Sequence, residues 1–130
     1  PGIFGLNEAL KYIEKEGIEN IRKAEMELTG LFINGIKALE GVRLAGLDGI
    51  EGRTAVVSID CEGKDNAEVS YLLDKDFGIM TRCGLHCAPS AHKTLDTFPQ
   101  GTVRFSFSHF NTEKEIIYAL DALNKILNSI

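Results

Sequence analysis

The chain has 130 residues, of which 44% are hydrophobic and 25% are charged, an ordinary composition for one soluble globular domain with a single core. Its net charge is −5 and its basic residues are scattered, so we expect no nucleic-acid partner. The sequence has neither a secretion signal nor an apolar run approaching the roughly 20 residues that cross a bilayer. These features predict a cytoplasmic protein with no membrane partner.

Two amphipathic helices are predicted at the start of the chain. Apolar side chains recur at helical spacing as far as Gly17, where the first helix is expected to end. A longer helix is then expected to run to Gly41, on the apolar stripe of Ile18, Ile21, Ala24, Leu28, Leu31, Phe32 and Leu39. The chain opens on Pro1-Gly2 without an initiator methionine, so we expect it to be a segment of a longer protein.

Strands and a helix are predicted for the middle of the chain. β-Branched residues favour strands over residues 42–44 and 54–59. Asn66 is expected to cap a helix over residues 67–74, because its side chain can accept from the first backbone amides of a helix. A strand over residues 79–82 should follow that helix.

The segment after residue 89 is rich in small and polar residues and is expected to be a loop as far as Gly101. Alternating polarity then predicts a half-buried strand over residues 103–107. Arg104 and Ser106 fall on the outward side of this strand.

Thr112 and Glu115 form a capping box, which predicts the start of the last helix. The order of the predicted elements favours an α+β fold, with a small, mainly antiparallel sheet covered by helices on one side. We expect a single domain over residues 1–130, in which residues 1–40 are a helical lead-in and residues 41–130 form the α+β part.

Residues 82–89 concentrate the chemistry of the chain at the end of a predicted strand. A thiol reacts as the thiolate, and Arg82, or His86 when protonated, would favour that form of Cys87. Gly84 allows a tight turn that would present Cys87 to a ligand. Free cysteines are, however, more often small buried hydrophobic residues, so local physics leaves both interpretations open.

The sequence has three cysteines at irregular spacing, which argues against a disulfide framework. Four potential metal ligands lie close together in the sequence: Cys83, His86, Cys87 and His92. Their spacing does not match the usual ligand pairs, and the adjacent His86 and Cys87 suit a tetrahedral ion poorly, so we expect no metal. Cys61 has no neighbouring cation or histidine and is expected to be structural.

Three stretches together resemble a known family: Arg82-Cys83-Gly84-Leu85-His86-Cys87-Ala88-Pro89, Val103-Arg104-Phe105-Ser106 and Asn111-Thr112. They are similar to the C-terminal segment of cysteine desulfurases, which belong to the class V aminotransferase family of pyridoxal-phosphate enzymes. The short spacing between Cys87 and Arg104 resembles the selenocysteine-lyase-like, Suf-type branch. The resemblance implies that residues 1–130 are the C-terminal small domain of a fold-type I enzyme, whose large domain precedes them.

The resemblance also implies roles for four residues. The family's cysteine at the position of Cys87 attacks the sulfur of a cysteine substrate held on the cofactor, which releases alanine and leaves a persulfide. The arginine at the position of Arg104 holds the substrate carboxylate, a task that suits the two parallel donors of a guanidinium. Arg82 and His86 match motif positions and are expected to line the substrate site.

This sequence departs from the family pattern at two positions. Cys83 stands where the pattern has threonine, and it is left open as a resolving or a spectator thiol. Leu85 stands where the pattern has histidine, which leaves the catalytic acid or base unassigned.

Pyridoxal phosphate is implied as the cofactor of the full-length enzyme. Its lysine and phosphate donors belong to the large upstream domain, so we expect residues 1–130 alone to bind no cofactor and to be inactive. Residues 90–93 superficially resemble the stretch that carries the family's lysine, but they follow Cys87, and Lys93 is expected to be a solvated loop residue.

The resemblance implies cysteine or selenocysteine as the substrate. It also implies a sulfur-acceptor protein as a partner, in iron–sulfur cluster assembly or another sulfur-transfer pathway, and a homodimer for the full-length enzyme. The oligomeric state of residues 1–130 alone is left open.

Two other functions stay open from the sequence. A cofactor-free sulfur-carrier domain would use Cys87 with sulfur from a partner, although Arg104 suits a small carboxylate better than a protein surface. A non-catalytic interaction or dimerisation domain would carry a thiol of ordinary reactivity at Cys87.

Overall fold

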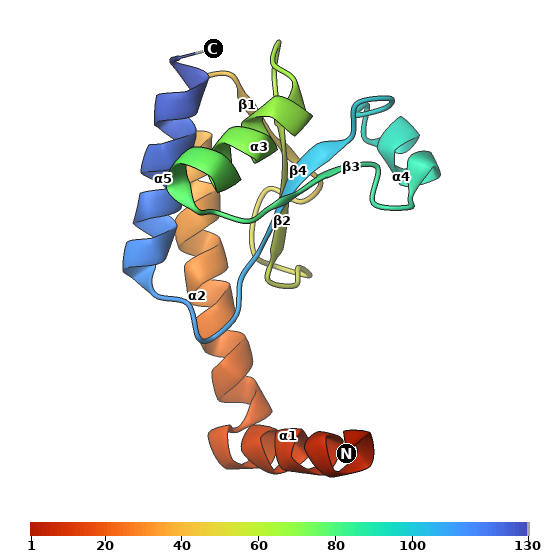
Figure 1. Ribbon diagram of the computed structural model, residues 1–130, viewed down its shortest axis with the longest axis vertical. Coiled ribbons are helices and arrows are strands. Elements are labelled where there is room, and N and C mark those ends of the chain that lie inside the picture. The colour runs from red at the N-terminus through yellow and green to blue at the C-terminus, as the bar shows by residue number, and fades with distance from the viewer. Residues whose placement is uncertain (130) are drawn as a thin grey trace.

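A computed structural model describes residues 1–129, so Ile130, the last residue of the predicted domain, lies outside the described residues. The elements follow in the order α1 (Gly2–Glu16), α2 (Ile18–Lys37), β1 (Val42–Ala45), β2 (Val56–Cys61), α3 (Asn66–Phe77), β3 (Arg82–Gly84), α4 (Pro89–Thr94), β4 (Thr102–Ser106) and α5 (Glu113–Leu127) (Figure 1). The strands form one antiparallel sheet in the order β1-β2-β4-β3. The predicted α+β fold is confirmed.

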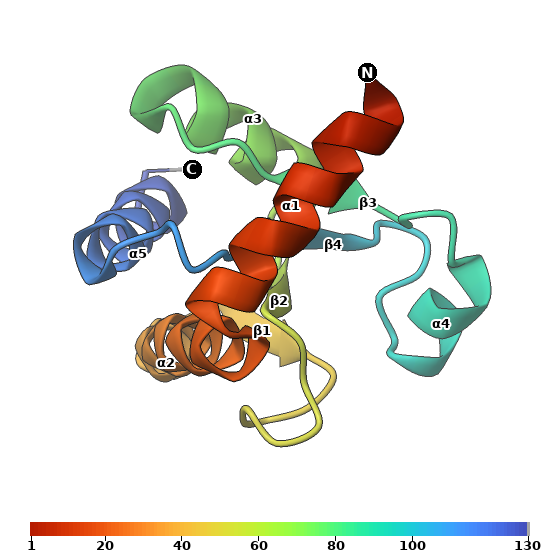
Figure 2. The ribbon, with the colours of Figure 1, turned by 90° about the horizontal axis from the view of Figure 1, so that it is seen from below.

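Helices cover one face of the sheet. α2, α3 and α5 lie on the same side of it, whereas α4 lies at the far end of β3 and β4 (Figures 1 and 2). The covered face carries the alternate, buried side chains Val57, Ile59, Cys61, Val103 and Phe105. They pack with Phe32, Ile33 and Ile36 of α2, Val69 and Leu73 of α3, and Leu123 of α5. The core therefore lies between this face and the three helices.

Among residues 1–129, no helix packs across the opposite face of the sheet, here called the open face, and the segment of residues 85–101 covers it only near Arg43 and the buried Thr102. Arg43, Ser58 and Arg104 project from it, because side chains alternate between the two faces of a strand. None of these three residues is fully buried.

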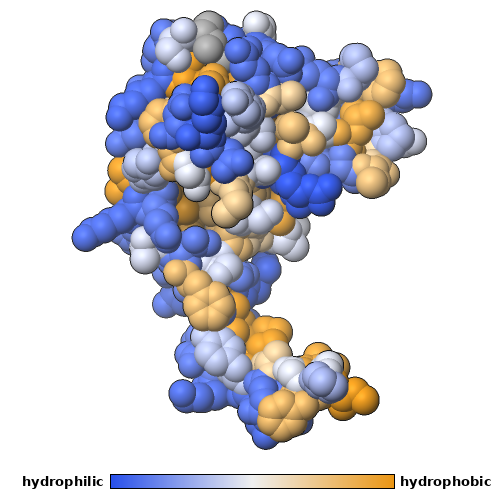
Figure 3. Space-filling model, in the orientation of Figure 1, coloured by the Kyte–Doolittle hydropathy of each residue, from blue (hydrophilic) through white to orange (hydrophobic). Residues whose placement is uncertain are grey.

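α1 extends away from the body of the molecule and contains no buried residue (Figure 1). Its position relative to α2 is set at Gly17, where φ is 81°. Tyr12 connects α1 to the segment after β4, because its hydroxyl lies 3.0 Å from His109 Nε2 and its ring stacks on Phe110. Apolar side chains of α1 are exposed below the body, among them Ile3 and Phe4 (Figure 3).

Several predicted boundaries are confirmed. The first helix ends before Gly17, and the capping box joins Thr112 and Glu115 at the start of α5. Arg104 and Ser106 are the less buried positions of β4, as the alternation predicts. None of the helices within residues 1–129 is both long and apolar enough to cross a membrane.

The predicted cap of α3 is wrong. Asp65 caps this helix, since its Oδ1 accepts from the backbone N–H of Ala67 at 2.8 Å. Asn66 is the first residue of the helix, and its side chain is turned inward and fully buried. A buried amide must find partners for its polar atoms, and these partners come from outside α3.

Two other predictions on either side of the cysteine segment are wrong. β3 begins only at Arg82, because the backbone N–H of Ile79 donates to Leu73 O and completes the C-terminal cap of α3. The predicted loop after residue 89 contains the short helix α4, which has Pro89 at its first position, where a missing N–H is tolerated.

Candidate active site

Arg104 lies in the middle of the open face. The register of β4 places it directly opposite Ser58 of β2 on one side and Arg82 of β3 on the other. Its Nε is buried and has no hydrogen-bond partner within the described part of the chain. The sheet therefore fixes the backbone of Arg104, and one of its guanidinium donors has no partner in the protein.

The pairing of Arg82 with Arg104 places like charges opposite each other on neighbouring strands, an arrangement that is unfavourable by itself. Neither arginine forms an ion pair with any residue between 1 and 129. An anionic group bound between them would relieve the repulsion. The open face at this point therefore favours a carboxylate or another small anion.

Cys87 lies in a tight turn that follows β3. The turn closes through a hydrogen bond of 2.8 Å from Ala88 N–H to Leu85 O, and its two central residues are His86 and Cys87. Both have positive φ, 49° for His86 and 62° for Cys87, in a region that costs non-glycine residues on the order of 1 kcal/mol or more. The Cys87 side chain is exposed. The backbone thus presents the thiol at the surface in a conformation that its surroundings must maintain.

His86 connects this turn to the open face. Its Nε2 lies 3.5 Å from Thr102 Oγ1, two residues before Arg104, and its Nδ1 is buried with no hydrogen-bond partner among residues 1–129. Burial lowers the pKa of His86, and the neighbouring charges of Arg104, His92 and Arg82 lower it further. The His86 imidazole is therefore neutral near neutral pH, with a proton on only one of its two ring nitrogens.

Neutral His86 adds no positive charge beside Cys87, so the expected effect of a protonated His86 on the thiolate is confined to lower pH. The two arginines of β3 and β4 are the permanent cations near the turn.

The other two thiols lie apart from the open face. Cys83 pairs in register with the buried Val103, so it projects toward the helix-covered face, where it lines a hollow with Ala67, Ser70 and Tyr71 of α3. This orientation favours the spectator role over the resolving role for Cys83. Cys61 is buried, and burial raises its pKa to about 11, so the thiol stays protonated at neutral pH, as expected of a structural residue.

No group of three or more histidine, cysteine or carboxylate side chains is arranged to hold a metal ion within residues 1–129. Lys93 is exposed, and its Nζ lies 5.2 Å from the centre of the Phe98 ring. A lysine that binds pyridoxal phosphate needs a buried site with phosphate donors, so Lys93 and its surroundings do not fit the cofactor.

Sequence reasoning missed Thr102. The alternation that places Arg104 and Ser106 on the outward side places Thr102 there too, and this signal was available. The contact of Thr102 with His86 depends on the turn at residues 85–88, which has no local signature.

Comparison with known proteins identifies the family. The model for aminotransferase class V matches residues 1–118. The chain belongs to the class V aminotransferase family. A probable cysteine desulfurase of Pyrococcus abyssi is 34% identical over 129 residues, which cover 99% of this chain and 31% of the relative. A probable cysteine desulfurase of Xylella fastidiosa is 33% identical over 126 residues, 96% of this chain and 29% of the relative.

Solved structures match as well. An apo cysteine desulfurase from Thermococcus onnurineus superposes with a TM-score of 0.85 at 32% identity, and the match covers 92% of this chain and 29% of that one. A cysteine desulfurase from Escherichia coli, with a TM-score of 0.86 at 24% identity, supports the fold, over 98% of this chain and 30% of that one. The chain thus spans under a third of these relatives.

Proposed function

We propose that the whole protein is a pyridoxal-phosphate-dependent cysteine desulfurase, to which this chain contributes Cys87 as the nucleophile and Arg104 as the clamp for the substrate carboxylate. The observation that carries the proposal is that His86, in the turn that exposes Cys87, lies 3.5 Å from Thr102, two residues before the unpaired Arg104. The family membership and the similarity to cysteine desulfurases support it.

Arg104 would bind the substrate first. Its guanidinium offers parallel N–H donors that match a carboxylate, and the strands on both sides of β4 fix the backbone from which it projects. Arg82 adds a second positive charge at the same end of the open face. Both features favour an amino acid over an uncharged thiol as the substrate.

Cys87 would then attack the substrate sulfur as a thiolate. A sulfur–sulfur bond forms, the carbon–sulfur bond of the substrate breaks, and the sulfur remains on Cys87 as a persulfide. Pyridoxal phosphate, when bound by the rest of the protein, would supply the electron sink for this reaction. Protonation of the former sulfur-bearing carbon gives alanine.

His86 would hold a proton beside the reacting sulfur. It is neutral and has a buried Nδ1 without a partner, so it can bind or release one proton without leaving the turn. Arg82 and His86 therefore line the substrate site in this proposal.

The proposal extends to the surroundings of the reaction. We infer a cytoplasmic enzyme that forms a homodimer and passes the persulfide sulfur to an acceptor protein, for iron–sulfur cluster assembly or another sulfur-transfer pathway. Cysteine is the proposed substrate, and selenocysteine presents the same carboxylate to Arg104. The similarity to cysteine desulfurases over nearly the whole chain favours neither the cofactor-free sulfur carrier nor the non-catalytic interaction domain.

Alanine release from cysteine tests the proposed function. In the full-length protein supplied with pyridoxal phosphate, Cys87→Ala should abolish the reaction, while the matched variant Cys83→Ala should retain it, because Cys83 faces the other side of the sheet. Equal losses in the two variants, or alanine release by Cys87→Ala at the unmodified rate, would reject the assignment of Cys87.

A further inference from the structure

The turn that carries Cys87 is held at both of its ends by one loop, residues 95–101. Before the turn, Gly84 lies directly against Gly101, since a Cβ atom on Gly101 would come within 2.2 Å of the Gly84 carbonyl group. After the turn, α4 is attached through His92, whose Nδ1 lies 2.7 Å from Thr97 Oγ1. Thr97 and Gly101 belong to the same loop and are joined by a hydrogen bond from Gly101 N–H to Thr97 O.

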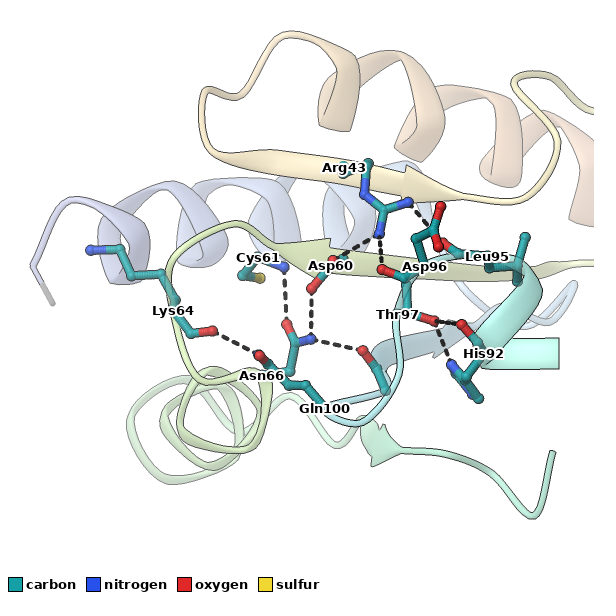
Figure 4. A network of polar contacts seen from close by, with 11 residues as sticks. Arg43, Asp60, Cys61, Lys64, Asn66, His92, Leu95, Asp96, Thr97 and Gln100 are labelled. Atoms are coloured by element: carbon teal, nitrogen blue, oxygen red, sulfur yellow. Dashed lines mark hydrogen bonds and ion pairs between the residues drawn. The ribbon is translucent and has the colours of Figure 1, made fainter. Parts of the chain in front are cut away.

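The buried Asn66 holds the end of this loop. Its Nδ2 donates to Gly101 O at 3.0 Å and to Asp60 Oδ1 at 2.9 Å, while its Oδ1 accepts from Cys61 N–H at 2.9 Å. Figure 4 shows the amide between β2 and the loop. Asn66 is fully buried, so bulk water does not compete for these bonds.

Arg43 holds the beginning of the loop. Its guanidinium forms an ion pair with Asp60 Oδ2 at 2.9 Å and donates to Leu95 O and Asp96 O, each at 3.1 Å (Figure 4). Asp60 thus accepts from Arg43 on one carboxylate oxygen and from Asn66 on the other. One continuous polar network fixes both ends of the loop to the sheet.

We propose that Asn66, supported by Asp60 and Arg43, is a positioning residue that sets the place of Cys87 relative to Arg104. This inference rests on the proposed function. Arg104 is fixed by the strand ladder on both sides, whereas the Cys87 turn has positive φ at two non-glycine residues and depends on its anchors. Loss of the network should therefore disturb the attack by Cys87 and leave carboxylate binding by Arg104 nearly intact.

The test compares Asn66→Ala and Arg43→Gln with Leu123→Ala, in the full-length protein with pyridoxal phosphate. Leu123 is buried in α5 on the helix-covered face, so its truncation destabilises the domain without touching the loop. The readouts are the single-turnover rate constant for persulfide formation on Cys87, which does not depend on the folded fraction, and the dissociation constant of alanine, which has the same carboxylate as the substrate.

We expect Asn66→Ala to lower the rate constant about tenfold or more, because small misplacements of reacting groups are costly, while alanine binding changes less than about twofold. Arg43→Gln should have the same effect to a smaller degree. Leu123→Ala should leave the rate constant unchanged. The inference would be overturned by an unchanged rate constant in Asn66→Ala or by an equal decrease of the rate constant in Leu123→Ala. It would also be overturned if Asn66→Ala weakened alanine binding by the same factor as it lowered the rate constant.

Two further observations keep the test decisive. If Asn66→Ala does not fold, Arg43→Gln replaces it in the test, because Arg43 is partly exposed. An unchanged rate constant in Arg43→Gln would then overturn the inference.

Hydrogen exchange of the Ala88 amide, which closes the turn, should be at least about tenfold faster in Asn66→Ala than in Leu123→Ala. Absence of persulfide in the unmodified protein rejects the proposed function, while equal Ala88 exchange in the two variants rejects the positioning role independently.

Discussion

The two faces of the sheet are built from the same strands, yet they carry different properties. Val103 points into the core on the helix-covered face and the exposed Cys83 lines a hollow on that same face, while their neighbours Arg104 and Arg82 point to the open face. The helix-covered face carries the apolar core, and the open face has unpaired polar atoms at His86 and Arg104. Alternation along a strand thus separates the residues that stabilise the fold from those proposed to act on a substrate.

The reactivity of the thiols should differ most strongly between the two faces. In the native full-length protein, iodoacetamide should modify Cys87 roughly a thousandfold or more faster than Cys61, because Cys61 is buried, its pKa is raised to about 11, and it reacts only after local opening. Peptide mapping by mass spectrometry after timed alkylation measures both rates. Comparable rates at the two residues would contradict the burial of Cys61.

Truncation on the covered face should reduce stability. Leu123→Ala should lower the free energy of unfolding of this domain by about 2 to 5 kcal/mol, since it leaves a cavity in a fully buried cluster. Hydrogen exchange of the slowest core amides measures this change, and Ser106→Ala, at an exposed position of the open face, serves as the control. A decrease in the free energy of unfolding of less than about 1 kcal/mol for Leu123→Ala would show that the core is not tightly packed around Leu123.

Removal of the arginine on the open face should weaken substrate binding. Arg104→Ala should raise the KM for cysteine about 10- to 100-fold, because the carboxylate loses a charge-assisted, bidentate partner. Steady-state kinetics of the full-length protein measures this effect, with Arg22→Ala on the exposed surface of α2 as the control. An unchanged KM in Arg104→Ala would remove this residue from the substrate site.

The smallest expected effect concerns the pH dependence of stability. Because folding lowers the pKa of His86 from its ordinary value of 6.5, the unfolded chain binds the proton more tightly than the folded chain does. The contribution of neutral His86 to the free energy of unfolding is therefore fully present above pH 6.5, and it is lost as the pH falls below that value. Thermal unfolding between pH 8 and pH 5 should show a smaller loss of stability in His86→Gln. An identical pH profile would indicate an unperturbed histidine.

Much of the fold followed from local patterns. Gly17, the capping box at Thr112 and Glu115, and the alternation around Arg104 are decided by neighbours in the sequence, and each prediction was confirmed. The prediction that Asn66 caps α3 was wrong. Its side chain bonds to Asp60, Cys61 and Gly101, and Gly101 lies far away in the sequence.

The sequence predicts which residues belong to the candidate site, but it does not predict how they are arranged. Cys87, His86, Arg82 and Arg104 were named from motif positions that resemble a family pattern. The positive φ values in the turn, the contact of His86 with Thr102 and the neutral state of His86 depend on how β3 and β4 pair, which single residues do not reveal.

The location of the persulfide tests the central claim most directly. The full-length protein, supplied with pyridoxal phosphate, would be incubated with cysteine, trapped with an alkylating agent, and mapped by peptide mass spectrometry over its three cysteines in this chain. We predict one additional sulfur atom on Cys87 and none on Cys83 or Cys61. A persulfide on Cys83, or one that survives in Cys87→Ala, would contradict the assignment of the open face as the active site.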